Sequence, residues 1–198
     1  MIDIPQRRDS GIPKGLGTDA FRAEEKHGVI WVALEEPIYP IPDMPETADT
    51  DYRRIDEFYE VWNAPGLRVM ENSFDNAHFS YVHAKSFGIN EEPDPAPLSI
   101  EPTSDGFLMR AVVPVKNPDI QKKNLNQDGD RTVRNYEKTW YAPFSRKMKI
   151  TYPDGLIHII YTLTAPIDDQ RSMVTQFALR TDTEADAPAA DIIAFDRQ

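Results

Sequence analysis

The chain has 198 residues, no cysteine and a formal net charge of −11, and 40% of its residues are hydrophobic. This composition predicts a globular protein of one domain, or of one domain and part of another. It excludes a disulfide framework, a cysteine-based zinc site and a cysteine-held iron–sulfur cluster within the chain. The acidic charge argues against binding to nucleic acid or to an anionic membrane surface. No apolar run reaches about 18 residues, so we expect a soluble cytoplasmic protein without a membrane span.

The first fifty residues show little regular pattern. Residues 28–34 form a continuous apolar run, which predicts a buried strand, although no partner strand is evident before it. His27, which precedes this run, is expected to be a turn residue. The prolines between residues 37 and 45 forbid pairing in a central strand, so this segment is interpreted as a linker.

Regular patterns begin near residue 55. A short strand is predicted at residues 58–62. Apolar side chains at helical spacing predict a helix over residues 68–84, with Gly88 as a stop.

The second half of the chain is dominated by strand patterns. A hairpin turn is expected at Asp154–Gly155, residues 116–131 are interpreted as a long polar loop, and a helix is expected to start near Pro188. One helix against a meander of about five strands predicts an α+β fold. The predicted strands cover residues 107–115, 136–141, 147–152, 156–164 and 172–181.

The segment 71–83, ENSFDNAHFSYVH, contains the residues that indicate chemistry. Two imidazoles with a carboxylate suit iron(II), because a two-histidine, one-carboxylate set leaves positions open for oxygen and substrate. On a straight helix His78 and His83 lie about 140° apart, so both can face one metal only if the helix bends or ends between them. Asp75 and His78 share a face, which would let Asp75 accept the second N–H of a metal-bound His78.

Simpler interpretations of these residues remain open. Asn72 and Asp75 could be the N-cap and the first-turn acid of a helix. His78 could be a hydrogen-bonded core histidine, and His83 a solvated residue of the last turn. His158, in the strand pattern 156–164, faces either a pocket or solvent.

A substrate that carries a carboxylate would need a cationic partner. The nearest basic cluster that could supply this partner in the pocket is Arg146, Lys147 and Lys149, and a solvated strand edge explains this cluster equally well.

The pattern Asn72-x-x-Asp75-x-x-His78-x4-His83 resembles the iron-binding motif in the large (alpha) subunit of Rieske non-haem iron oxygenases. The run 71–75 is similar to a sequence that these proteins show at that place, and residues 20–32 resemble the stretch that follows their Rieske cluster motif. The chain looks most like the oxygenases of the vanillate demethylase and chlorophyllide oxygenase kind.

The resemblance implies a fold and a set of roles. The fold would be a helix-grip (START-like) antiparallel sheet around a pocket. Residues 1–50 would be the C-terminal tail of a Rieske domain and a proline-rich linker, and residues 51–198 a catalytic mononuclear-iron domain. His78 and His83 would be iron ligands, Asp75 would carry electrons from the Rieske cluster of a neighbouring subunit, and Asn72 would lie close to the iron without binding it firmly.

The implied reaction is a monooxygenase or dioxygenase reaction at Fe(II), with hydroxylation or oxidative demethylation of a small, aromatic-type organic substrate. A Rieske [2Fe–2S] cluster, fed by a reductase or ferredoxin, would supply electrons, and the full-length protein would be a homotrimer. The alternative is a START-like module that binds a hydrophobic ligand and has no enzymatic activity.

The sequence departs from this family pattern in two places. The Rieske cluster requires two cysteines, and the chain has none, so we do not expect it to bind the cluster. The third iron ligand of the family is an aspartate that we expect beyond Gln198, since Asp191 and Asp196 are weak candidates. We therefore expect a fragment that lacks its last helix, binds iron weakly and is inactive on its own.

Overall fold

The computed structural model describes residues 12, 13, 15–125 and 127–197. The chain divides into two compact units, Met1–Ile41 and Pro42–Gln198, which are described separately. Among the described residues, no helix is long and apolar enough to cross a membrane.

The described part of the first unit contains a β-hairpin. Strand β1 (Arg22–Lys26) pairs antiparallel with β2 (Val29–Ala33). His27 and Gly28 form the turn with φ angles of 59° and 73°, the left-handed geometry of a tight hairpin loop, so His27 is confirmed as a turn residue. The prediction of a buried strand without a partner is wrong, because β2 pairs with β1 and the side chain of Ile30 is 74% exposed.

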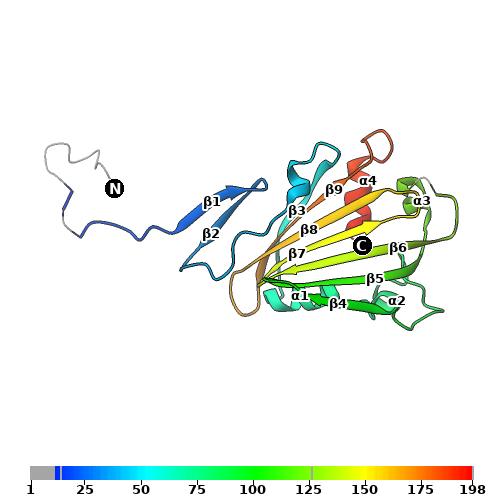
Figure 1. Cartoon of the computed structure of the whole chain (residues 1–198), viewed down its shortest axis with the longest axis horizontal. Helices are drawn as coiled ribbons and strands as arrows, with labels where there is room; N and C mark the ends of the chain where they lie inside the picture. Colours follow the sequence, from blue (N-terminus) through cyan, green and yellow to red (C-terminus); the bar gives the residue numbers. More distant parts are fainter. Residues whose placement is uncertain (1–11, 14, 126, 198) are drawn as a thin grey trace. The chain divides into compact units, whose positions relative to one another are not determined.

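The second unit is built on one antiparallel sheet of seven strands (Figure 1), in the order β3-β9-β8-β7-β6-β5-β4. The helices are the 3-10 helix η1 (Pro45–Ala48), α1 (Gly66–Phe74), α2 (Phe79–Val82), α3 (Asp119–Leu125) and α4 (Ala189–Asp196). The predicted α+β class is confirmed. The strands are β3 (Arg53–Trp62), β4 (Leu98–Pro102), β5 (Gly106–Lys116), β6 (Arg131–Tyr141), β7 (Ser145–Thr151), β8 (Ile157–Pro166) and β9 (Ser172–Arg180).

Most of the strand predictions agree with the sheet. The five predicted runs in the second half correspond to β5–β9, and a helix does follow Pro188. Strand β4 was not predicted, because it is an exposed edge strand that ends in proline. The interpretation of residues 116–131 as a loop is wrong in part, since they contain α3.

The predicted helix over residues 68–84 is two helices. The first, α1, ends at Phe74, and Asp75 is extended, with φ −78° and ψ 118°. The carboxylate of Asp75 accepts the backbone N–H of Ala77 at 2.7 Å, so a side chain replaces the helical acceptor at this point. The second helix, α2, is only four residues long (Phe79–Val82), and His78 and His83 flank it as its N-cap and C-cap, so the helix ends between the two histidines.

The two faces of the sheet have different coverings. On the inner face, α1 packs Val69 and Met70 against Val174, and α4 packs Ile192 against Ala178. On the outer face, Glu46 of η1 accepts hydrogen bonds from Lys147 and Tyr161. The inner face is therefore the face covered by α1, which contains Asn72, and by α4.

Candidate functional site

A cavity of about 190 Å³ is lined by side chains of the inner face and of the helices that cover it. Three of the four predicted site residues, Asn72, His78 and His83, line it. The cavity wall is unusually polar for a protein interior, and it includes Arg134 and Lys138 from β6, Arg146 from β7, Thr162 from β8, Gln176 from β9 and Asp196 from α4.

The two predicted iron ligands face each other across a short distance. The ring centroids of His78 and His83 are 5.2 Å apart. Nδ1 of His78 is 3.2 Å from Oδ2 of Asp75, which leaves Nε2 of His78 for another partner. Nδ1 of His83 is buried and has no hydrogen-bond partner among the described residues. Burial lowers the pKa of His83, and positive charge on His78 and Arg134 lowers it further, so the ring is in the neutral form that binds metals.

Asp75 lies next to the cavity, behind His78, and its side chain is 48% exposed. Burial opposes ionisation, but hydrogen bonds from the Ala77 amide and from His78 outweigh it and lower the pKa of Asp75. The carboxylate therefore stays ionised and fixes the orientation of the His78 ring, as carboxylates beside metal-bound histidines do.

The simpler interpretations of Asn72, Asp75 and His83 are not supported. Asn72 lies within α1, and Asp75 is the C-cap of that helix, so neither residue is its N-cap. His83 is partly buried and stacks on Phe87, with ring centroids 4.6 Å apart, and is therefore not a solvated side chain.

The residues present fit two of the three positions of a two-histidine, one-carboxylate iron site. The buried, unpartnered Nδ1 of His83 and the oriented ring of His78 are suitable donors. Within the described ranges, no third carboxylate or histidine joins this pair within 4.8 Å. Asp196 lines the same cavity, whereas Asp191 forms an ion pair with Lys123 at 2.6 Å.

A second cluster that sequence reasoning did not find lies nearby. Glu57, His158 and Asp196 have potential ligand atoms that all lie within 4.8 Å of one another, and all three side chains are largely buried. Glu57 is the extra residue at a β-bulge of β3 between Asp56 and Phe58. The bulge brings its carboxylate to Nε2 of Gln176, at 2.5 Å, and the sequence contains no signal for it beyond an acidic residue beside a strand pattern.

The hydrogen bonding of this second cluster is incomplete, and burial changes the protonation of its members. Arg180 has only donors, and its Nη1 lies 3.3 Å from Nδ1 of His158, so Nδ1 is an acceptor and the ring proton is on Nε2. That nitrogen lies 3.3 Å from Oδ2 of Asp196, but neither atom has a hydrogen-bond partner among the described residues. Burial and the charge on Arg180 lower the pKa of His158 to about 3. Burial and the neighbouring Asp196 raise the pKa of Glu57 to about 8.

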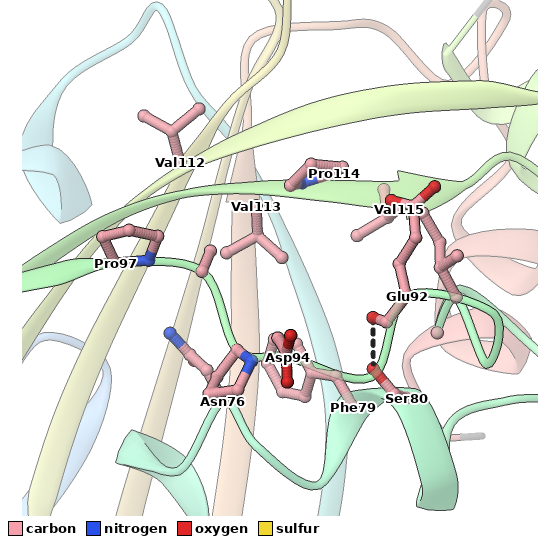
Figure 2. A pocket seen from close by; sticks show the side chains of 14 residues that line it. Asn76, Phe79, Ser80, Glu92, Asp94, Pro97, Val112, Val113, Pro114 and Val115 are labelled. Carbon is pink, nitrogen blue, oxygen red and sulfur yellow. Dashed lines mark hydrogen bonds between the residues drawn. The ribbon is translucent and has the colours of Figure 1, made fainter.

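A separate pocket of about 400 Å³ opens beside β5 (Figure 2). Its lining is mainly apolar, with Val113 and Val115 on one side, and the hydroxyl of Ser80 donates to the carbonyl of Glu92 at 3.2 Å. None of the four predicted site residues lines it, so the smaller cavity is the candidate functional site.

Comparison with protein families gives one match that covers most of the chain. Residues 62–197 match the family model described as the vanillate O-demethylase oxygenase C-terminal domain. Methylxanthine N1-demethylase NdmA of Pseudomonas putida is 24% identical over 168 residues, which cover 83% of this chain and 46% of that protein. The vanillate O-demethylase oxygenase subunit of Pseudomonas sp. (strain ATCC 19151) is 35% identical over 95 residues, which cover 45% of this chain and 28% of that protein.

Solved structures show the same fold. NdmA of Pseudomonas putida, as a QL mutant with caffeine, superimposes with a TM-score of 0.76 at 21% identity, over 98% of this chain and 53% of that chain. Dicamba monooxygenase bound to dicamba gives a TM-score of 0.78 at 15% identity, over 96% of this chain and 58% of that chain. The large antiparallel sheet thus matches the helix-grip-like fold of Rieske oxygenase catalytic domains, and the chain spans about half the length of these relatives. The chain belongs to the vanillate O-demethylase oxygenase C-terminal domain family, the catalytic domain of Rieske oxygenase alpha subunits.

Proposed function

We propose that this domain binds a mononuclear Fe(II) through His78 and His83 and serves in the dioxygen-dependent hydroxylation or oxidative demethylation of a small organic substrate in the adjoining cavity. The family uses a mononuclear iron. The observation that carries the proposal is the pair of imidazoles that flank the short helix α2 and lie at a centroid distance of 5.2 Å at the cavity wall.

The residues around the two histidines have separate tasks in this proposal. Iron held there would supply dioxygen activation. Asp75 holds the His78 ring through Nδ1 and, being partly exposed, is placed to connect the site with an electron-donating Rieske cluster of a neighbouring subunit. Asn72 lines the cavity and is free to contact substrate near the metal.

Several wider predictions belong to this proposal. Electrons would come from a reductase or ferredoxin through the Rieske [2Fe–2S] cluster, and the assembly would be a homotrimer. The assignment of residues 1–50 to the end of a Rieske domain and a linker, and of residues 51–198 to the iron domain, remains a prediction.

The lining of the cavity disfavours the alternative of a module that binds only hydrophobic ligands. Arg134, Lys138 and Arg146 are each at least 92% buried around this cavity. Burying charged groups is costly, and an apolar ligand would give them no compensation. The lining therefore favours a substrate with polar groups.

Metal binding to the purified chain tests the proposal. Anaerobic calorimetry with Fe(II) should give one equivalent bound to the wild type. The affinity should be lost in His78→Ala and His83→Ala, and it should fall about 10–100-fold in Asp75→Asn, because an oriented histidine binds metal more tightly.

The control is Glu57→Gln, which removes a carboxylate from the second cluster and leaves the two cavity histidines intact. It should bind iron like the wild type. Loss of binding in Glu57→Gln with retention in His83→Ala would contradict the assignment.

A further inference from the structure

The larger pocket, beside β5, lies where the sheet has a gap. Strand β4 pairs with residues 107–111 of β5, whereas residues 112–115 pair, among the described strands, with β6 only. The segment that precedes β4 contains Pro93, Pro95 and Pro97, and it cannot extend the ladder because proline has no backbone N–H to donate. The gap leaves a pocket of about 400 Å³ between this segment, β5 and α2 (Figure 2).

The walls of this pocket are mainly apolar. Phe79 of α2 and the valines Val113 and Val115 of β5 are among the residues that line it. A volume of about 400 Å³ is typical of small-molecule sites, which measure about 300–1,000 Å³ and are mostly apolar with a few polar groups. A cavity of about 150 Å³ already accommodates one benzene molecule, so this pocket has room for a ring with substituents.

The charged groups at the pocket are acidic. Glu92 and Asp94 line it, and none of the described lining residues is a lysine, an arginine or a histidine. Glu92 is paired with Arg131 at 2.5 Å, and Glu91, which lies outside the lining, is paired with Lys116 at 3.6 Å. Asp94 is exposed and has no cation within 4.0 Å in the part of the chain that the structure describes. The lining therefore disfavours an anion and presents one carboxylate without a partner.

Phe79 separates this pocket from the candidate functional site, because it lines both cavities. Its ring centroid lies 5.0 Å from that of His78 and 6.0 Å from that of His83, with interplanar angles of 87° and 72°. Rings packed edge to face in a dense interior cannot move independently of one another. A ligand that contacts Phe79 in the larger pocket therefore acts on both imidazoles through this ring.

A hydrogen bond forms a second connection between the two cavities. Asn76 lines the larger pocket, and Lys138 lines the smaller cavity. Nζ of Lys138 donates to Oδ1 of Asn76 at 2.7 Å. The partition between the cavities is therefore one side chain thick at Phe79 and two side chains thick at Asn76 and Lys138.

We propose that the pocket beside β5 is a second ligand site, which binds a small ammonium cation with an apolar body, and that its occupancy is transmitted through Phe79 to His78 and His83. The apolar walls suit the body of such a ligand, and Asp94 supplies the counter-charge. This inference goes beyond the proposed function, since neither the binding step nor its readout requires iron.

Binding of benzylamine and of benzyl alcohol to the purified 198-residue chain tests the ligand class. The two probes have nearly the same shape, and only benzylamine is charged at neutral pH. Calorimetry is performed with EDTA, so iron does not contribute. Benzylamine should bind about fivefold more tightly, as expected for an exposed ion pair. Asp94→Asn, at an exposed position, should abolish this preference, and Ala96→Trp, which fills the pocket, should abolish the binding of both probes.

NMR of isotope-labelled histidine side chains tests the transmission. Saturation with benzylamine should shift the ring signals of His78 and His83 and leave those of His158, which does not line the pocket, unchanged. Phe79→Leu keeps the lining apolar and removes the aromatic ring. This variant should still bind benzylamine, but the two histidine signals should no longer shift.

A matched control removes the same charge from the same segment. Glu91→Gln, outside the lining, should keep the wild-type preference for benzylamine. Equal binding of the two probes, no binding of benzylamine, or a preference that survives in Asp94→Asn would overturn the ligand class. Binding without a shift at His78 and His83 would overturn the transmission. A chain that shows the preference and the shifts but binds no iron would contradict the proposed function alone.

Discussion

Two neighbouring cations of β7 show how differently the two faces of the sheet are built. Lys147, on the outer face, forms an ion pair with Glu46, whose other oxygen accepts the Tyr161 hydroxyl at 2.8 Å. Arg146, on the inner face, is more deeply buried but has no carboxylate partner in the described part of the chain. The cation on the outer face thus has a carboxylate partner, whereas the cation on the inner face has none within ion-pair distance among the described residues.

Removing the outer-face carboxylate should have the largest effect on stability. Glu46→Ala leaves a partly buried ammonium and the buried Tyr161 hydroxyl without their acceptor. The free energy of unfolding should fall by about 2–3 kcal/mol, the usual penalty for an orphaned buried group. Urea denaturation measures this change. A loss below about 0.5 kcal/mol would show that the contacts of Glu46 with Lys147 and Tyr161 contribute little to stability.

The pH dependence of stability should reveal the protonation of Glu57 in the folded chain. The folded-state pKa of Glu57, about 8, lies above the ordinary value of 4.5, so the folded chain binds more protons than the unfolded chain between these values. Stability should therefore fall as the pH rises through this window, by at most about 1.4 kcal/mol per pH unit. The decline should be smaller in Glu57→Gln, and chemical denaturation at several pH values would detect the difference. An identical slope in both proteins would contradict the raised pKa of Glu57.

Replacing the inner-face cation should cost little stability. Arg146→Met removes a buried charge that lacks a counter-ion and keeps much of the side-chain volume, while Thr162 keeps its bond to Gln176. The free energy of unfolding should stay within about 1 kcal/mol of the wild type or increase, as often happens when buried charges are replaced by apolar groups. A loss comparable to that of Glu46→Ala would mean that Arg146 is a structural residue.

The smallest effect is expected at the exposed end of the same strand. Lys149 is 30% exposed and pairs with Glu137 at 3.3 Å. Lys149→Gln should change stability by about 0.5 kcal/mol or less, since exposed ion pairs contribute little. The same denaturation measurement serves as the baseline for the other three variants. A larger change would indicate that removing a charge from β7 lowers stability on either face of the sheet.

The sequence predicts the sheet better than it predicts the helices. Alternating apolar residues identify β5–β9 because each of these strands has one face in the core. The periodicity of residues 68–84 predicts one helix, but the Asp75 carboxylate interrupts it, a local contact that periodicity does not contain.

The candidate site was only partly accessible to sequence reasoning. The spacing of His78 and His83 singles out a segment that lines the cavity, because a family motif is contiguous in sequence. Arg146 lines the cavity through strand register, and Glu57 reaches Gln176 of the cavity wall through a β-bulge. Both positions depend on the pairing of distant strands. The sequence placed Arg146 in a basic cluster with Lys147 and Lys149, and only the register shows that it faces inward.

The location of bound iron is the most direct test of the account. Crystals of the chain grown anaerobically with Fe(II), and measured at the iron absorption edge, should show one anomalous peak next to the imidazoles of His78 and His83. A peak among Glu57, His158 and Asp196, with none at the two cavity histidines, would contradict the account.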